Sequence, residues 1–403
     1  MTDSTLNPVR RLPLPEFIGL MAILFATIAF SIDAMLPALP EIAAELVPDD
    51  VNSAQLVLTS FMMGMGIGTL FAGPISDALG RKLTISLGLL IYIAAAFGAH
   101  YASSLESLLV LRVLQGLGAA SPRIVGLALV RDLYQGREMA RISSFVMMVF
   151  IMVPALAPAA GQLIINIGGW RAIFLAFIAL GLFNLTWLNL RQAETLAPPA
   201  RRPLAFGTLI AGAREVLSDR QVMICMVVMT LGFGQMFALL ASAQQLFGET
   251  YHQGDRFPVL FAAMALLASV GTILNMRYVV QLGMRRIAKA AYMMQIVSAA
   301  LFLTTLLTGI LPEPLRFPAF FLWAVSVFAM AGVTFGNLNA LAMQRMGHIA
   351  GMTASIVSAF STLGAILIAA PVGLMFNGTA IPVASAALIC SSVAWLLMRQ
   401  LED

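Results

Sequence analysis

The sequence predicts an all-α membrane protein whose twelve transmembrane helices form two six-helix bundles. Apolar residues make up 60% of the 403 positions and charged residues only 10%, whereas soluble globular domains carry about 25% charged residues. Apolar runs of about 20 residues, the length that crosses ~30 Å of hydrocarbon as a helix, recur along the whole chain. One long polar interval, residues 191–219, divides these runs into six and six.

Residues 1–190 are predicted to form the N-terminal six-helix bundle. The first apolar run, residues 17–39, follows Arg10 and Arg11, as the apolar part of a signal peptide would. It is longer than such a segment and lacks a small-residue cleavage site, so we expect it to be retained as the first span. The other spans of this bundle are predicted at residues 54–73, 83–101, 105–130, 141–165 and 170–190.

Residues 220–403 are predicted to form the C-terminal six-helix bundle. The interval before it, residues 191–219, contains prolines and arginines between positions 198 and 203 and is predicted to be a cytoplasmic linker. The spans of this bundle are predicted at residues 220–247, 257–276, 287–310, 317–342, 350–375 and 380–398.

The basic residues predict the orientation, because cytoplasmic loops of membrane proteins carry an excess of Lys and Arg. With the N-terminus in the cytoplasm, most of the 23 Lys and Arg residues fall in cytoplasmic segments. The external segment 40–53 then carries only acidic charges. Both termini are therefore expected in the cytoplasm, with the chain in the cell inner membrane as a multi-pass protein.

Several classes of function are disfavoured by the composition. Cys225 and Cys390 fall inside apolar runs, and the three histidines show no ligand spacing, so neither a disulfide framework, a metal site nor a cofactor is expected. The net charge of +4 is attributed to orienting loops rather than to nucleic-acid binding. The sequence has no cluster of acids, histidines or nucleophiles near either membrane face that would suggest an enzyme. The expected partners are the lipid bilayer, a small-molecule substrate and protons, and the expected state is a monomer.

Two charged residues of opposite sign lie at matched depths in predicted spans. Asp33 belongs to the first span and Arg112 to the fourth, and each is a functional-site hypothesis because an ionisable group in hydrocarbon costs about 2.5–3.5 kcal/mol. A rise of 1.5 Å per residue places them roughly 9 Å and 10 Å from the outer helix ends. If the two spans are neighbours, Asp33 can load and release a proton beside Arg112. The alternative is a fixed ion pair that only joins two helices.

A second arginine, Arg123, lies deeper on nearly the same face of the fourth span. It follows Arg112 by eleven residues, about 16 Å along the helix, with Gln115 between them. No acid lies opposite at that depth. Arg123 is therefore predicted either to attract an anionic or carbonyl-rich substrate, or to reach the cytoplasmic interface or carbonyls freed by Pro122.

The segment between the second and third spans, residues 73–82, reads Gly-Pro-Ile-Ser-Asp-Ala-Leu-Gly-Arg-Lys. Its glycines allow a tight turn, and its charges can interact with neighbouring helix ends. The segment resembles the G-x-x-x-D-x-x-G-R-K/R signature of the major facilitator superfamily, although the corresponding turn near Gly283 has Val280 in place of the acid. The resemblance implies two six-helix bundles and a conformational latch at the cytoplasmic side, formed by Gly73, Asp77, Gly80, Arg81 and Asp132.

Further segments extend this resemblance. Residues 111–118 are similar to the fourth-helix signature, whose arginine, Arg112 here, is tied to proton coupling. Residues 154–161 are similar to the fifth-helix signature of antiporters, with alanine at two positions where glycine is usual. The matching positions of that signature are Pro154, Pro158 and Gly161.

The pattern around Asp33 resembles drug exporters of the same superfamily. Leu36-Pro37 and Leu39-Pro40 follow Asp33, as in the first helix of those proteins. The pairs Arg131-Asp132 and Gly169-Trp170 are similar to segments of the Bcr/CflA-type drug:proton antiporters. The resemblance implies substrate contacts on helices that line the central cavity, where the candidates are Gln115, Arg123, Phe233, Gln235, Met236, Phe237, Asn337 and Asn339.

The sequence therefore predicts a secondary transporter that exports small, mostly apolar drugs or metabolites in exchange for protons, by alternating access of its two bundles. Asp33 is the expected proton carrier and Arg112 its modulator. The alternative is a proton symporter or uniporter that imports a small metabolite, including an anion attracted by Arg123. A membrane enzyme or receptor is disfavoured. The glycines near residues 64–68 are expected to be close helix contacts rather than ligand sites.

Overall fold

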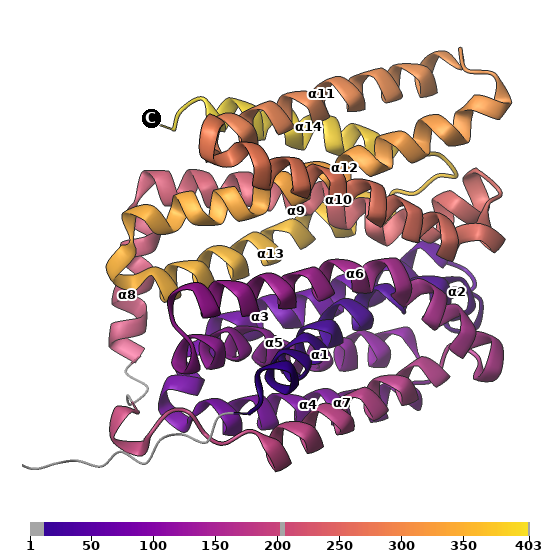
Figure 1. Ribbon diagram of the computed structural model, residues 1–403. Helices are drawn as coiled ribbons and strands as arrows, with labels where there is room; N and C mark the ends of the chain where they lie inside the picture. The colour runs from indigo at the N-terminus through magenta and orange to yellow at the C-terminus, as the bar shows by residue number, and fades with distance from the viewer. Residues whose placement is uncertain (1–11, 202–205, 402–403) are drawn as a thin grey trace, which may run out of the picture.

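The computed structural model describes residues 12–201 and 206–401, and in those residues the secondary structure is entirely helical (Figure 1). The basic residues Arg10 and Arg11 and residues 202–205 of the linker lie outside the described residues. The helices of the first half are α1 (Leu14–Asp33), α2 (Leu39–Leu46), α3 (Leu56–Leu79), α4 (Arg81–His100), α5 (Leu105–Leu133), α6 (Gly136–Gly168) and α7 (Ala172–Arg191).

Among the remaining described residues, one α-helix lies in the linker and six long α-helices follow it. The linker helix is α8 (Phe206–Ser218), which the sequence analysis did not predict. The later helices are α9 (Arg220–Gln245), α10 (Phe257–Leu282), α11 (Met284–Thr308), α12 (Glu313–Arg345), α13 (Ala350–Leu374) and α14 (Ile381–Met398). Among the described residues, eleven helical stretches are long and apolar enough to cross a membrane, and α6 adds the shorter apolar stretch Met152–Gly168.

The long helices lie side by side in two groups (Figure 1). The indigo-to-magenta group holds α1 and α3–α7, and the pink-to-yellow group holds α9–α14. The groups meet where α3 packs against α13 and α6 packs against α10. We call the end of the molecule that carries α8 the linker end, and the opposite end, which carries α2, the far end.

The first span differs from its predicted form. A single helix was expected over residues 17–39, but α1 ends at Asp33, and a 3₁₀ turn (Leu36–Ala38) leads into α2. Pro37 explains the break, because it has no N–H to donate to the carbonyl of Asp33 and its ring clashes with that carbonyl in a continuous helix. Asp33 is thereby moved from the middle of a helix to its last residue.

Small residues let α3 and α5 approach closely. A Cβ atom on Gly64 would overlap the carbonyl of Val113, and one on Gly116 would overlap the carbonyl of Phe61. A Cβ on Gly66 would lie 2.9 Å from the side chain of Leu363 on α13. The prediction that the glycines of residues 64–68 are close helix contacts is confirmed. The close approach also brings the backbone of α3 within reach of the Arg112 side chain.

Candidate functional site

Arg112 of α5 is fully buried and bonds to three helices. Its Nη2 donates to the carbonyl of Ser31 on α1 (3.0 Å), and its Nε donates to the carbonyl of Val57 on α3 (3.2 Å). Its Nη1 donates to Oε1 of Gln115 on α5 (2.7 Å), and the guanidinium carbon lies 4.4 Å from the centre of the Phe61 ring. The planar guanidinium can satisfy these separate acceptors because its N–H groups point in fixed, diverging directions.

The bond to Ser31 follows from the way α1 ends. The last four carbonyls of a helix have no intrahelical partner. Two of those in α1 accept backbone N–H groups, Phe30 from Ala34 and Ile32 from Met35. The carbonyl of Ser31 instead accepts from Arg112. A cation at this place also interacts favourably with the negative end of the helix dipole. Arg112 therefore caps α1 from a neighbouring helix.

Asp33 does not form the fixed ion pair with Arg112 that was the alternative to a proton-loading role. Within the described residues, no Asp33 oxygen lies within 4.0 Å of the guanidinium, although both side chains are described and Asp33 is only 5% exposed. The depth estimate was sound, because Arg112 reaches Ser31, two residues before Asp33. The acceptor is the backbone carbonyl of Ser31, which points along the helix axis, so the guanidinium reaches the end of α1 without forming an ion pair with the carboxyl group of Asp33. The prediction was right about depth and did not anticipate which group of α1 Arg112 binds.

A chain of buried polar side chains runs from this cap along α1. Ser31 Oγ lies 2.7 Å from the Tyr92 hydroxyl on α4, and Asn184 of α7 donates to Thr27 Oγ1 at 2.8 Å. All four side chains are buried. The sequence analysis missed them, although the spacing of four residues between Thr27 and Ser31 placed two hydroxyls on one face of an apolar helix. They fix α1 against α4 and α7 around Arg112.

The antiporter signature lies on α6, where it crosses the end of α1. Pro154 and Pro158 lie inside this helix. A Cβ on Gly161 would overlap the carbonyl of Ala34, the residue that follows Asp33. Gly161 therefore lets α6 pack directly on the backbone next to Asp33, which is itself buried.

Replacing Gly161 with Ala is expected to destabilise the protein. The added methyl gains helix propensity, up to about 1 kcal/mol, but it forces α6 away from α1, and overpacking costs about 1–3 kcal/mol. Gly336→Ala in α12 is the matched control, because a Cβ there meets nothing within 4 Å. Thermal unfolding in detergent should show a lower midpoint for Gly161→Ala and an equal or higher one for Gly336→Ala. Equal midpoints for Gly161→Ala and the unaltered protein would contradict the close packing.

The aromatic candidates of α9 form a ring cluster in the second group of helices. The ring of Phe233 lies 3.9 Å from that of Phe335 on α12 and 5.4 Å from that of Phe237. Phe237 is buried, whereas Phe233 and Met236 are partly buried. This cluster is apolar, so it can bind a ligand through shape and dispersion forces, and the ring faces can also attract a cation.

The amide side chains predicted to contact substrate mostly form hydrogen bonds within the second group of helices. Gln235 is 1% exposed and accepts from Ser391 Oγ on α14 at 3.1 Å, while its Nε2 is buried without a hydrogen-bond partner. Asn337 donates to Asn275 of α10 at 2.8 Å. Asn339 is partly buried, and its Oδ1 is buried without a partner. Gln235 and Asn337 therefore join helices of one group, and Asn339 keeps a free acceptor.

Arg123 is partly buried on α5 and is not without an interaction partner. The role of Arg123 therefore stays a prediction, with both alternatives given above: attraction of an anionic or carbonyl-rich substrate, or contact with the cytoplasmic interface or freed carbonyls. Gln115 is likewise engaged through Oε1 with Arg112, although its Nε2 is buried without a partner.

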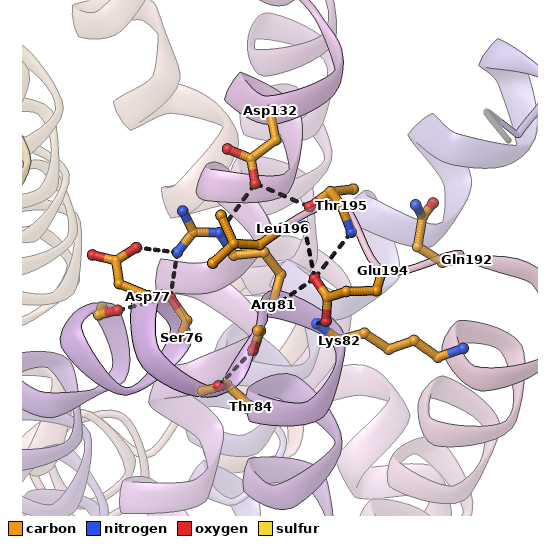
Figure 2. A network of polar contacts seen from close by, with 12 residues as sticks. Ser76, Asp77, Arg81, Lys82, Thr84, Asp132, Gln192, Glu194, Thr195 and Leu196 are labelled. Carbon is orange, nitrogen blue, oxygen red and sulfur yellow. Dashed lines mark hydrogen bonds and ion pairs between the residues drawn. The ribbon is translucent and has the colours of Figure 1, made fainter. Parts of the chain in front are cut away.

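The predicted latch residues come together at the linker end (Figure 2). Arg81, at the start of α4, pairs through Nη1 with Asp77 of α3 and through Nε with Asp132 of α5 at 3.0 Å. Its Nη1 also donates to Ser76 Oγ at 2.7 Å. Gly80 makes the turn with φ +106°, a conformation that side chains other than glycine rarely adopt. A Cβ on Gly73 would lie 3.9 Å from Ser355 Oγ, which places this end of α3 beside α13.

Amide side chains join the two groups of helices at the far end, a contact that the sequence analysis did not predict. Gln55 donates to Oε1 of Gln245 on α9, whose Nε2 donates to Asn52 Oδ1 at 2.9 Å. Asn52 then donates to the carbonyl of Phe376 at 2.9 Å, and Ser242 donates to Gln55 Oε1 at 3.2 Å. These uncharged bonds hold the far end together.

Comparison with known proteins agrees with this architecture. The family model described as Major Facilitator Superfamily matches residues 21–369. The chain is 28% identical to a "Bicyclomycin resistance protein homolog" of Haemophilus influenzae, over 87% of each protein. It is 30% identical to a "Multidrug resistance protein MdtL" of Salmonella heidelberg, over 69% of this chain and 68% of that protein.

A solved structure shares the same fold at low sequence identity. The xylose transporter XylE from E. coli, in a partially occluded inward-open conformation, superposes with a TM-score of 0.75 at 13% identity, covering 97% of this chain and 98% of that one. The match to the family model spans most of the sequence, including the latch segment, the fourth-helix arginine and the antiporter signature. The chain therefore belongs to the Major Facilitator Superfamily and is a multi-pass membrane transporter rather than an enzyme.

Proposed function

We propose that this transporter exports small, mostly apolar drugs across the cell inner membrane in exchange for protons. In this proposal the chain is a monomer with twelve spans, α6 included, and both termini and the linker end face the cytoplasm. Residues 1–190 and 220–403 are the two moving bundles, joined by the linker 191–219. The names of the two relatives support drugs as the substrate class, and the apolar ring cluster around Phe233 supports a largely apolar ligand.

One observation carries the proposal: a buried carboxyl group, that of Asp33, ends a helix that Arg112 caps. An ionised carboxylate buried in an apolar site is costly without a partner. It also lies at the negative end of the α1 dipole, where a negative charge is unfavourable. Protonation or deprotonation of Asp33 therefore changes the free energy of the end of α1, which Arg112 caps, by a large amount. A residue that couples proton binding to transport needs this property.

Arg112 is placed to transmit that change. It bonds the carbonyl of Ser31 and the carbonyl of Val57 at once, so it joins the ends of α1 and α3. When Asp33 is ionised it can attract the guanidinium away from these carbonyls, and when it is protonated the cap on α1 is restored. In this mechanism the coupling runs through the end of α1 and needs no permanent ion pair between Asp33 and Arg112.

The two ends of the molecule supply the alternating barriers. At the far end, the bonds among Asn52, Gln55 and Gln245 must break before substrate can leave on that side. At the linker end, we assign the latch to Gly73, Asp77, Gly80, Arg81 and Asp132. Their ion pairs hold α3, α4 and α5 of the first bundle in the arrangement that places the Gly73 end of α3 beside Ser355 of α13 in the second bundle. Opening one end while the other stays bonded gives alternating access.

Flux measured in proteoliposomes tests this function. The panel contains bicyclomycin as a neutral compound, tetraphenylphosphonium as a cation and benzoate as an anion, each with the pH gradient set in both directions. We expect the neutral compound, the cation or both to move against the direction of proton flow, with no transport of benzoate. Movement of any substrate together with protons would instead support an importer, and no gradient dependence would support a uniporter.

A further inference from the structure

The segment that follows α7, residues 192–196, folds back onto the latch (Figure 2). The carboxylate of Glu194 accepts the backbone N–H of Arg81 through Oε1 at 2.9 Å and that of Lys82 through Oε2 at 3.0 Å. Its Oε1 also accepts the N–H groups of Thr195 and Leu196, at 2.9 and 3.0 Å. One carboxylate thus orders its own segment and binds the start of α4.

The start of α4 needs such an acceptor. The first N–H groups of a helix have no intrahelical partner, and they form the positive end of the helix dipole. The residue before α4 is Gly80, which has no side chain with which to cap them. A Cβ at this glycine would lie 2.5 Å from Oε2 of Glu194. Gly80 therefore provides both the turn and the space through which Glu194 reaches α4.

The neighbouring residue holds the other side of the latch. Thr195 Oγ1 donates to Oδ2 of Asp132 at 2.9 Å. That same oxygen accepts Nε of Arg81 at 3.0 Å. Glu194 thus fixes the backbone of Arg81, and Thr195 fixes the carboxylate that Arg81 binds. Two adjacent residues, Glu194 and Thr195, therefore hold both partners of one ion pair. Both lie outside the signature segment, residues 73–82.

The continuation of the linker is attached to the second bundle. Helix α8 packs against α13 and α9, and Glu215 of α8 lies 2.8 Å from Nε2 of His348, just before α13. The linker thus binds the latch through Glu194 and Thr195 and binds the C-terminal bundle through α8. Any movement of one bundle relative to the other must therefore be taken up by the chain between these two attachments.

We infer that Glu194 and Thr195 are positioning residues of the latch, which hold Arg81 and Asp132 together and make closure of the linker end depend on the linker. The inference rests on the latch role proposed above. In the transport cycle, opening of the linker end requires these two side chains to release α4 and Asp132. The latch in this protein therefore includes Glu194 and Thr195 beside Gly73, Asp77, Gly80, Arg81 and Asp132.

Hydrogen exchange at single amides tests the contact first. Glu194→Ala should speed exchange of the Arg81 and Lys82 amides by about tenfold or more, because charge-assisted bonds to both are lost. Glu194→Gln keeps one acceptor oxygen, so it should affect one of the two amides more than the other. Thr195→Val should leave both amides protected. Glu16→Gln is the matched control, because Glu16 pairs with Arg191 near the same end without binding α4.

Distances between spin labels test the consequence. In a background with Cys225→Ala and Cys390→Ala, labels at the exposed positions Gln135 and Gln400 report the linker end, and labels at Tyr101 and Ile310 report the far end. Glu194→Ala and Thr195→Val should each shift the linker-end distribution to longer distances, whereas Glu16→Gln should not. Unchanged distances in both variants would overturn the positioning role, even if amide protection were lost. The measurement needs no transported drug, so it can fail or succeed independently of the proposed antiport.

Discussion

Replacing Asp33 with Asn is expected to abolish substrate efflux driven by a pH gradient, while the protein remains folded. Asn has nearly the same shape but cannot exchange a proton, so the energy of the junction at the end of α1 no longer depends on protonation. Because Asp33 makes no ion pair with Arg112 in this conformation, its neutral replacement breaks no such bond. The variant should keep its thermal stability and lose coupling.

Efflux rates in proteoliposomes, measured beside thermal unfolding, check this expectation. Asp255→Asn is the matched control, because Asp255 is exposed in the far-end turn Gly254–Arg256. The control should transport like the unaltered protein. An Asp33→Asn variant that still pumps drug against its gradient at the normal rate would remove Asp33 from the mechanism and leave the fold assignment intact.

Arg112→Lys is expected to cause the second largest loss, a fall in transport of tenfold or more. Lysine keeps the charge, but its compact ammonium cannot reproduce the fork that reaches Ser31, Val57 and Gln115 together. Each hydrogen bond to a charged group contributes about 1.5–3 kcal/mol, and a loss of 1.4 kcal/mol already corresponds to a factor of ten. Arg112→Met should be at least as impaired, because it removes the cap of α1 altogether.

Two controls separate this role from general damage. Arg277→Met alters an exposed arginine of α10 and should transport normally. Gln115→Leu removes only the acceptor on α5 and leaves the carbonyls of Ser31 and Val57 bound, so its loss of transport should be smaller than that of Arg112→Lys. If Arg112→Lys transported as well as the unaltered protein, the cap on α1 would have no part in coupling.

Features of the chain that depend on local sequence were predictable. The spans follow from apolar runs, and the latch pair of Asp77 and Arg81 follows from one short segment that forms one turn. The partner Asp132 was predicted through the family resemblance and does bind Arg81. The antiporter signature likewise gave Gly161, although only the structure places it on the backbone next to Asp33.

Features that depend on angles around helices were not predictable. The rise per residue predicts depth well, but a helix that ends at Asp33 because of Pro37 presents its carbonyls, rather than that carboxyl group, to Arg112. The sequence pattern alone does not show which group at the end of α1 faces Arg112. Tyr92 was missed for the same reason, because the role of its hydroxyl depends on its contact with Ser31 on α1.

Contacts between distant segments were also beyond the sequence. Glu194 binds backbone amides more than a hundred residues earlier, which requires knowing where the linker folds back. The bonds between Gln55 and Gln245 join the two bundles and depend on the conformation of the transporter. Neither contact can be recognised from the local hydropathy or the spacing of residues in the sequence.

Proton release on substrate binding tests the central claim most directly. The purified transporter, in weakly buffered detergent with a pH-sensitive dye, is mixed with a compound that it transports. The account predicts that the unaltered protein releases protons on binding and that Asp33→Asn binds the same compound without releasing any. Equal release from both proteins, or none from the unaltered protein, would show that the carboxyl group at the end of α1 does not exchange its proton for substrate.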